Sequence, residues 1–193
     1  EIDLCGHATL ASGFVLDLVH NEFPSQVCFE TRSGLLSVTR QGEHYYLDFP
    51  SRPALPSPVI PELIAGLGVM PLAVHKARDY LAVFESEEQV RSLQPDFAKL
   101  STLDCLGIIA TAPGSEVDFV SRFFAPQTGI NEDPVTGSAH TSLTPYWSKV
   151  LGKKRLTARQ LSSRGGELIC EDKGSRVEIS GHAVTYLKGK IRI

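Results

Sequence analysis

The pattern of hydrophobic and polar positions along this chain predicts a mixture of strands and helices. Runs rich in β-branched and aromatic residues with alternating polar positions are typical of strands, and short Gly-containing connections between them are typical of hairpins. Three such runs follow one another near the start, joined at Ser33-Gly34 and Gln41-Gly42-Glu43. The predicted strands span residues 27–32, 35–40, 44–49, 72–76, 80–84, 105–111, 117–124, 167–171, 176–180, 183–187 and 190–193, while 157–161 is ambiguous.

Two longer segments carry apolar residues at helical spacing. Residues 10–19 are apolar or small on nearly every face, with Asp17 the only charge before His20, and such a helix is expected to be enclosed by other structure. The second helix ends near Gly152, and shorter helices are predicted at 61–67, 86–93 and 96–100. The apolar face of the second helix consists of Leu143, Tyr146, Trp147, Val150 and Leu151.

The order of these elements predicts an α+β fold with antiparallel pairing, because strands and helices come in separate groups. Each long apolar helix is flanked by meanders, which suggests a sheet rolled around a helix. Residues 50–58 are too rich in proline for either regular element, and we expect them to form an extended crossing. This crossing divides the chain into residues 1–50 and 51–193.

Composition excludes several classes of function. The chain has 193 residues, of which 42% are hydrophobic and 21% charged, and a net charge of −3 without a basic block gives no support for nucleic-acid binding. No apolar run approaches the roughly 20 residues that cross a bilayer, and no signal peptide is evident. The four cysteines lie far apart, which argues against a zinc site or a disulfide framework and favours a reducing, cytoplasmic setting.

The densest group of chemically capable residues lies at 129–140. Asp133 is followed by a proline and then by Thr136, Gly137 and Ser138, which predicts a helix N-terminus with Pro134 as its first residue. The unpaired N–H groups and positive dipole of such a terminus attract a carboxylate or another anion.

A similar pattern opens the chain, where a glycine, a polar residue and an alanine again begin a helix at Gly6-His7-Ala8. If the two helix starts face each other, they form a carboxylate-binding cleft, and His7 and Asp133 could serve proton transfer at a carbon next to an acid group. The simpler alternatives are that His7 and Asp133 cap their own helices and that the Thr136 and Ser138 hydroxyls belong to turns.

Residues 1–11 and 131–140 together resemble the two signature motifs of the phenazine-biosynthesis-like isomerase family, which is related to diaminopimelate epimerase. The resemblance implies two similar domains, each with a barrel-like antiparallel sheet around a central helix; residues 1–50 would belong to the first domain, rejoined by the C-terminal strands. It implies cofactor-independent isomerisation of a small carboxylated metabolite by proton shuttling, in a homodimer, while the spacing of the cysteines and histidines gives no metal site. Motif matching places Gly6 and His7 on one wall of the site, and Asp133, Thr136, Gly137 and Ser138 on the other.

The sequence departs from the family pattern at its start. The family's principal acid/base is a glutamate well upstream of the Gly-His motif, whereas this chain begins at Glu1, without a methionine and almost on that motif. We therefore expect N-terminal sequence to be missing and the 193-residue chain alone to be inactive. The alternative function is a non-catalytic binding or scaffold protein that retains the fold.

Other candidate chemistry is weaker. Cys5 stands where related epimerases carry a catalytic cysteine, but Thr136 occupies the partner position and is too weak an acid to replace a thiolate. Ser138 lacks the Gly-x-Ser-x-Gly turn of a hydrolase nucleophile. A turn at 164–166, together with Gln160, either reaches an outer carboxylate of the substrate or only joins two strands. We interpret the scattered histidines as surface or core residues: His20, His44, His75, His140 and His182.

Overall fold

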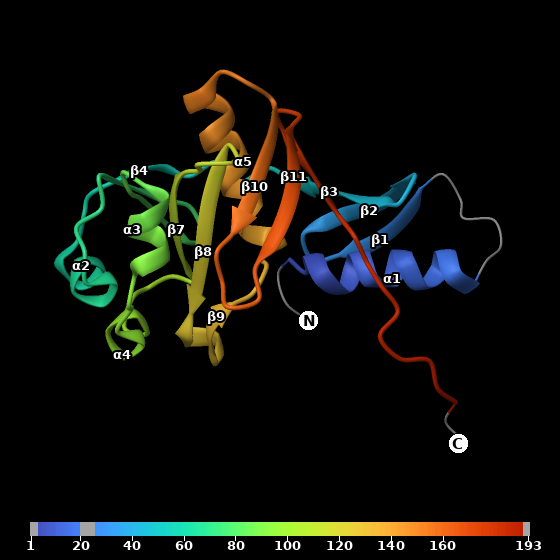
Figure 1. Cartoon of the computed structure of the whole chain (residues 1–193), viewed down its shortest axis with the longest axis horizontal. Coiled ribbons are helices and arrows are strands. Elements are labelled where there is room, and N and C mark those ends of the chain that lie inside the picture. Colours follow the sequence, from blue (N-terminus) through green and yellow to red (C-terminus); the bar gives the residue numbers. More distant parts are fainter. Residues whose placement is uncertain (1–3, 20–25, 191–193) are drawn as a thin grey trace.

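The computed structural model describes residues 4–19 and 26–190, and within them the strands form a single curved sheet (Figure 1). The helices are α1 (Gly6–Val19), α2 (Pro61–Leu67), α3 (Glu87–Ser92), α4 (Phe97–Leu100) and α5 (Gly137–Leu151), with a 3-10 turn η1 (Pro126–Thr128). The strands are β1 (Val27–Thr31), β2 (Gly34–Gln41), β3 (His44–Pro50), β4 (Leu55–Ser57), β5 (Ala73–Lys76), β6 (Tyr80–Val83), β7 (Ile108–Pro113), β8 (Phe119–Ala125), β9 (Ile130–Asp133), β10 (Arg155–Gln160), β11 (Gly166–Asp172) and β12 (Arg176–Gly181).

The strand order is β1-β2-β3-β12-β11-β10-β8-β7-β6-β5-β4, with β9 paired to β8 off this path. Most neighbours are antiparallel, as the sequence predicts, but β8 with β10 and β6 with β7 are parallel. The closing strand β12 pairs with β3, with Ile179 opposite Leu47, so the last strand of the chain lies beside the first meander.

Helix α5 lies inside the curve of the sheet. It packs along β10, β11 and β12, and its other contacts reach strands on the far side of the curve. The Trp147 indole N–H donates to the Thr111 hydroxyl of β7 at 2.9 Å, and the Tyr146 ring meets the His75 ring of β5 at a centroid distance of 5.1 Å. The predicted sheet rolled around a helix is therefore present around α5.

The apolar residues of β6, β7 and β8 alternate between two cores, because successive side chains of a strand point to opposite faces. Leu81, Ile109 and Phe119 face α5 in one cluster. Their neighbours Ala82, Ile108 and Val120 face the other way, where α2, α3 and α4 cover the sheet. The central strands are thus buried on both faces.

Among the described residues, helix α1 has packing partners along one face, and its other face is exposed. It packs against β2 and β3, where Gly13 lets it approach so closely that an added Cβ would lie 2.7 Å from Val38 Cγ1. Its other face is open, with Val15, Leu18 and Val19 exposed by 53%, 58% and 69%. The prediction of an enclosed helix is therefore wrong for the part of the chain that the structure describes.

A proline within α5 explains how residues 51–52 attach to it. Pro145 has no N–H, so the carbonyl of Thr141 loses its ordinary helical partner. The Arg52 N–H donates to this carbonyl at 3.0 Å, and the Ser142 hydroxyl donates back to the Arg52 carbonyl at 2.7 Å. The start of the proline-rich crossing is thereby fixed to the middle of α5.

Several element boundaries differ from the predicted ones. The proline-rich crossing contains the short strand β4, which pairs with β5 at the edge of the sheet. Pro56 is tolerated in this strand because an edge strand has a neighbour on one side only, and the missing N–H can face the other side. Residues 183–187, predicted as a strand, have no regular structure, and 184–187 are exposed, Tyr186 by 99%. Three other predictions fall outside the described residues. They are most of the strand at 190–193, the end of the first helix after Val19, and the position of His20.

Candidate functional site

The N-termini of α1 and α5 meet at two glycines, as the sequence predicts. A Cβ added to Gly6 would lie 3.3 Å from the Gly137 Cα, and one added to Gly137 would lie 3.4 Å from the Gly6 Cα. The Phe49 ring of β3 closes the contact from one side, 3.6 Å from the modified Gly6 and 3.8 Å from the modified Gly137. Only glycine at both positions allows the two backbones to come this close without displacement.

The start of α5 differs from the predicted one. The helix begins at Gly137 rather than at Pro134, because Asp133 is still part of β9 and pairs with Phe123 of β8. The residue at the N-cap position is Thr136, so Asp133 does not cap the helix. Its carboxylate instead accepts a hydrogen bond from the Thr136 hydroxyl, with 2.6 Å between Oγ1 and Oδ2.

Thr136 makes no side-chain capping bond to α5. A threonine at this position ordinarily accepts a hydrogen bond from the second or third N–H of its helix. Because the Thr136 hydroxyl is turned to Asp133, the first N–H groups of α5, those of Gly137, Ser138 and Ala139, lack this internal partner. They are oriented as donors for an anion placed ahead of the helix.

Gln160 and His140 bind the backbone of Thr136, and both side chains are fully buried. The Gln160 Oε1 accepts from the Thr136 N–H at 2.8 Å, and its Nε2 donates to the Asp133 carbonyl at 2.7 Å. The His140 Nδ1 lies 2.7 Å from the Thr136 carbonyl. The sequence predicted that Gln160 acts together with the turn at 164–166, whereas its amide is directed at residues 133–136. Binding of an outer carboxylate of the substrate by this turn stays a prediction for Arg164.

Ser138 and His7 each directly follow one of the two glycines that meet. Ser138, at the second position of α5, is half-buried, and His7, at the second position of α1, is exposed. Sequence reasoning missed Arg78, whose Nη2 donates to the Ser138 hydroxyl at 3.2 Å. Arg78 lies in the turn between β5 and β6, 60 residues before Ser138, and is paired at 2.8 Å with Asp79, which is 4% exposed. A buried acid in a hairpin turn was the signal that could have found it.

Two further ionisable side chains, those of His140 and Cys170, are buried in the core. Burial lowers the pKa of His140 to about 4, against the raising effect of its bond to Thr136, and burial raises the pKa of Cys170 to about 12. The structure thus confirms His140 as a core residue. Among the described residues, no group of three or more His, Cys, Asp and Glu side chains could hold a metal ion, and no helix is long and apolar enough to cross a membrane.

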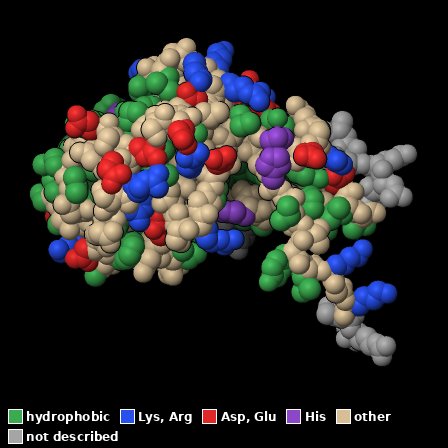
Figure 2. Space-filling view, in the orientation of Figure 1, with side chains coloured by type: hydrophobic (Ala, Val, Ile, Leu, Met, Phe, Trp, Pro, Cys, Tyr) green, Lys and Arg blue, Asp and Glu red, His purple; other side chains and the backbone are tan. Residues whose placement is uncertain are grey.

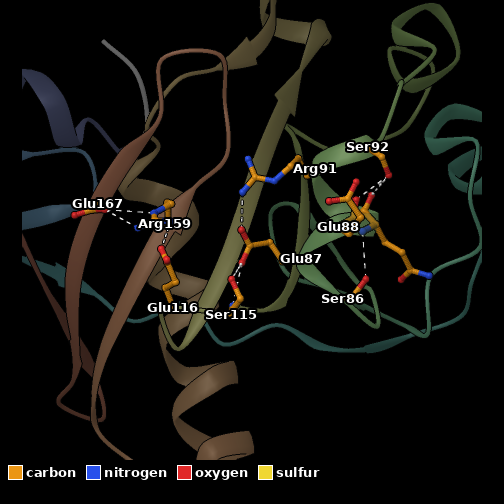
Figure 3. A network of polar contacts seen from close by, with 10 residues as sticks. Ser86, Glu87, Glu88, Arg91, Ser92, Ser115, Glu116, Arg159 and Glu167 are labelled. Carbon is orange, nitrogen blue, oxygen red and sulfur yellow. Dashed lines mark hydrogen bonds and ion pairs between the residues drawn. The ribbon is translucent and has the colours of Figure 1, made fainter.

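A second group of polar contacts joins α3, β10 and β11 to the residues that follow β7 (Figure 3). Glu87 accepts from the Ser115 N–H and hydroxyl at 3.0 and 2.9 Å, which lowers the pKa of this carboxyl. Arg159 is paired with Glu116 and Glu167, which are both largely exposed. Figure 2 shows acidic and basic side chains interspersed over the face it displays. Exposed pairs of this kind contribute little to stability.

The fold and the paired helix starts define a protein of the α+β, epimerase-like class, and comparison with known proteins gives the family. Residues 1–189 match the family described as phenazine biosynthesis-like protein. An uncharacterised isomerase of Pseudomonas aeruginosa is 52% identical over 196 residues, covering all of this chain and 74% of that protein. Mouse phenazine biosynthesis-like domain-containing protein 2 is 41% identical over 212 residues, covering 99% of this chain and 74% of that protein.

Solved structures agree with this assignment. A phenazine biosynthesis protein of the PhzF family from Enterococcus faecalis has a TM-score of 0.94 at 47% identity, covering all of this chain and 75% of that one. A predicted epimerase from Pseudomonas aeruginosa, at 15% identity and a TM-score of 0.64, shares the fold. The chain belongs to the phenazine biosynthesis-like family, as its motifs predict, and it spans about three quarters of the length of these relatives.

Proposed function

We propose that this protein is a cofactor-independent isomerase that moves a proton at a carbon next to the carboxylate of a small metabolite. The observation that carries the proposal is the meeting of two helix N-termini at Gly6 and Gly137, with His7 and Asp133 beside them. The names of the bacterial relatives, which include the word isomerase, support the class of reaction.

The first turn of α5 would bind the substrate carboxylate. The uncapped N–H groups of Gly137, Ser138 and Ala139 would donate to it, and the positive end of the helix dipole would stabilise it. Removal of a proton from the neighbouring carbon places more negative charge on the carboxylate oxygens, and donors fixed in advance stabilise that charge most in the transition state.

His7 and Asp133 would position the substrate or relay a proton. His7 is the second residue of α1, and its imidazole can donate a hydrogen bond to the substrate or accept one from it. One oxygen of Asp133 is bonded to Thr136, and its second oxygen would face the substrate. The family resemblance assigns the main acid/base role to a glutamate upstream of the Gly-His motif, so Asp133 and His7 would support that group.

The test is solvent exchange by the protein expressed from its complete gene. The protein would be incubated in deuterated water with a panel of β,γ-unsaturated acids and α-amino acids, and proton NMR would follow the signal at the reacting carbon. Exchange into an unsaturated acid indicates a 1,3-shift, and exchange at the α-carbon of an amino acid indicates a 1,1-shift.

Asp133→Asn should reduce exchange by a factor of about 10² or more, as expected for a positioned proton-transfer group. The matched control is Asp172→Asn, because the new amide oxygen can still accept the Gly174 N–H that Asp172 binds at 2.9 Å. Equal exchange by the Asp133→Asn variant and the unmodified protein would remove Asp133 from the mechanism. Carboxylate binding without any exchange would instead support a non-catalytic binding protein.

The family resemblance also implies a homodimer, and the spacing of the cysteines favours a cytoplasmic setting. Light scattering after size-exclusion chromatography should then give twice the mass of the chain, which is 21.0 kDa for these 193 residues. An intact mass of the same preparation shows whether the natural protein carries additional sequence.

A further inference from the structure

Thr136 is held at each of its three polar groups. Its N–H donates to Gln160 Oε1 at 2.8 Å, and its carbonyl lies 2.7 Å from His140 Nδ1. Its hydroxyl oxygen accepts from Gln160 Nε2 at 3.1 Å and donates to Asp133 Oδ2 at 2.6 Å. Since Thr136 is 4% exposed and both Gln160 and His140 are 0% exposed, water cannot readily replace these bonds.

The direction of these bonds keeps the hydroxyl away from α5. When Gln160 donates to the Thr136 oxygen, the hydroxyl proton is left to point at Asp133, and the donors line up from Gln160 through Thr136 to the carboxylate. Without Gln160, the hydroxyl is free to rotate and to accept the N–H of Ala139, as threonine does at an ordinary N-cap.

Self-capping of this kind would harm a carboxylate site in two ways. It would occupy an N–H group in the first turn of α5, and it would take the hydrogen bond away from Asp133. The same glutamine also donates to the Asp133 carbonyl at 2.7 Å, so it fixes the main chain of this residue as well as its side chain.

We propose that Gln160 is a positioning residue, which keeps the first turn of α5 uncapped for a substrate carboxylate and directs the Thr136 hydroxyl at Asp133. This inference rests on the proposed function. The alternative is that Gln160 only satisfies buried backbone groups. In that case its loss would lower the stability of the fold and would not change the capping of α5.

Two substitutions separate the roles of the amide. Gln160→Glu keeps an oxygen for the Thr136 N–H, but an ionised carboxylate cannot donate to the Thr136 hydroxyl or to the Asp133 carbonyl. Gln160→Met removes the donor and the acceptor while keeping a similar volume. The matched control is Gln127→Met, since Gln127 is a partly buried glutamine whose Nε2 donates to the Leu100 carbonyl at 3.0 Å, outside the site.

The first measurement is hydrogen exchange of the Ala139 amide in the folded protein, followed by NMR. We expect this amide to exchange more slowly in both Gln160 variants, because Thr136 then caps it, while other amides of α5 exchange at the same rate or faster. A purely structural role predicts faster exchange throughout α5, so the two explanations differ in sign at Ala139. Gln127→Met should leave the Ala139 amide unchanged.

The second measurement is the affinity for acetate, titrated by NMR at constant ionic strength. The affinity should fall about tenfold in both Gln160 variants, the effect of one charge-assisted hydrogen bond, and stay unchanged in Gln127→Met. Unchanged acetate affinity together with uniformly faster exchange in α5 overturns the proposal. Both measurements are made without turnover, so they stand even if the unmodified protein fails to isomerise the acids tested.

If neither Gln160 variant folds, substitutions of Thr136 test the same geometry. Thr136→Val keeps the shape but cannot cap α5 or reach Asp133, so the Ala139 amide should exchange at least as fast as in the unmodified protein. Acetate affinity should therefore stay unchanged in the Thr136→Val variant, and a tenfold loss in this variant, whose side chain cannot cap α5, would overturn the proposal. Thr136→Ser should also leave the acetate affinity unchanged, because serine keeps the hydroxyl that Gln160 directs at Asp133.

Discussion

Helices α1 and α5 start at the same point, and their surroundings then differ along the rest of their length. The sheet encloses α5, whose Leu143 and Trp147 are 0% and 2% exposed. In contrast, the described residues support α1 along one face, and its Leu18 is 58% exposed. The comparison shows that the sheet fixes α5 from several sides, while the position of α1 depends on a strip of contacts with β2 and β3.

The strip that holds α1 combines close packing with polar contacts. Gly13 lies against Val38, and the Phe14 ring meets the Tyr45 ring edge-on at a centroid distance of 5.6 Å. The single charge of the helix, Asp17, is paired with Arg40 at 2.7 Å and accepts a hydrogen bond from the Tyr45 hydroxyl. Burial and the neighbouring Asp17 raise the pKa of Tyr45 to about 12, so this hydroxyl remains a donor at neutral pH.

The largest expected difference between the two helices concerns their apolar residues. Leu143→Ala should lower the free energy of unfolding by about 3 kcal/mol, because the vacated space in the enclosed core cannot collapse completely. Leu10→Ala should cost about 1 kcal/mol, since Leu10 on α1 is only partly buried. Denaturant unfolding of both variants makes the measurement, and equal losses would show that α1 is enclosed as fully as α5.

The next expected effect is a loss of stability at low pH, which arises from His140 on α5. In the folded protein burial lowers the pKa of His140 to about 4, whereas the unfolded chain has an ordinary pKa of 6.5. Between these values the unfolded state binds more protons, so the stability is fully present above about pH 6.5 and is lost as the pH falls towards 4. The total loss should be roughly 3 kcal/mol, from about 1.4 kcal/mol for each unit of pKa difference.

The measurement is the denaturation midpoint from pH 7 to pH 4, with and without His140→Gln, which keeps a polar side chain that cannot take up a proton. The variant is expected to be less stable at pH 7, but its stability should fall less steeply below pH 6.5. A parallel decline in the two proteins would assign the acid sensitivity to other groups.

Much of the fold could be predicted from the sequence. The first three strands, the short helix stopped by Gly68, which has a φ of 75°, and the hairpin of β5 and β6 follow from local patterns. The path of the sheet does not, because the pairing of β12 with β3 joins residues about 130 positions apart and leaves no local signal. The exposed side of α1 was also beyond local reasoning, because hydrophobicity shows what a helix can bury and not what covers it.

The site shows the same division. The two motifs predicted that the helix starts face each other, and the structure shows that they do so through a close contact between Gly6 and Gly137. The motifs could not show that β9 extends to Asp133 and delays the helix to Gly137, since an acid before proline is also a common helix start. Arg78 and Gln160 reach the site through tertiary contacts and carry no motif of their own.

A moderate effect is expected from the strip that holds α1. Gly13→Ala places a methyl group 2.7 Å from Val38 Cγ1, a distance that a packed side chain can relieve only by moving. We expect a loss of about 2 kcal/mol in the free energy of unfolding, and most of it should return in the double variant Gly13→Ala with Val38→Ala. Thermal or denaturant unfolding measures both, and failure of the second substitution to restore stability would place the strain elsewhere.

The smallest expected effect tests the open face of α1 directly. Leu18→Gln keeps a residue of similar helix propensity and removes apolar surface that is already 58% exposed, so the change in unfolding free energy should stay within about 0.5 kcal/mol. The same substitution at Leu143, which is 0% exposed, buries an unpaired amide and should cost several times more. A loss of more than about 1 kcal/mol at Leu18 would mean that this face of α1 is covered in solution. The two helices would then differ only in the source of their covering surfaces, and α1 could be held as rigidly as α5.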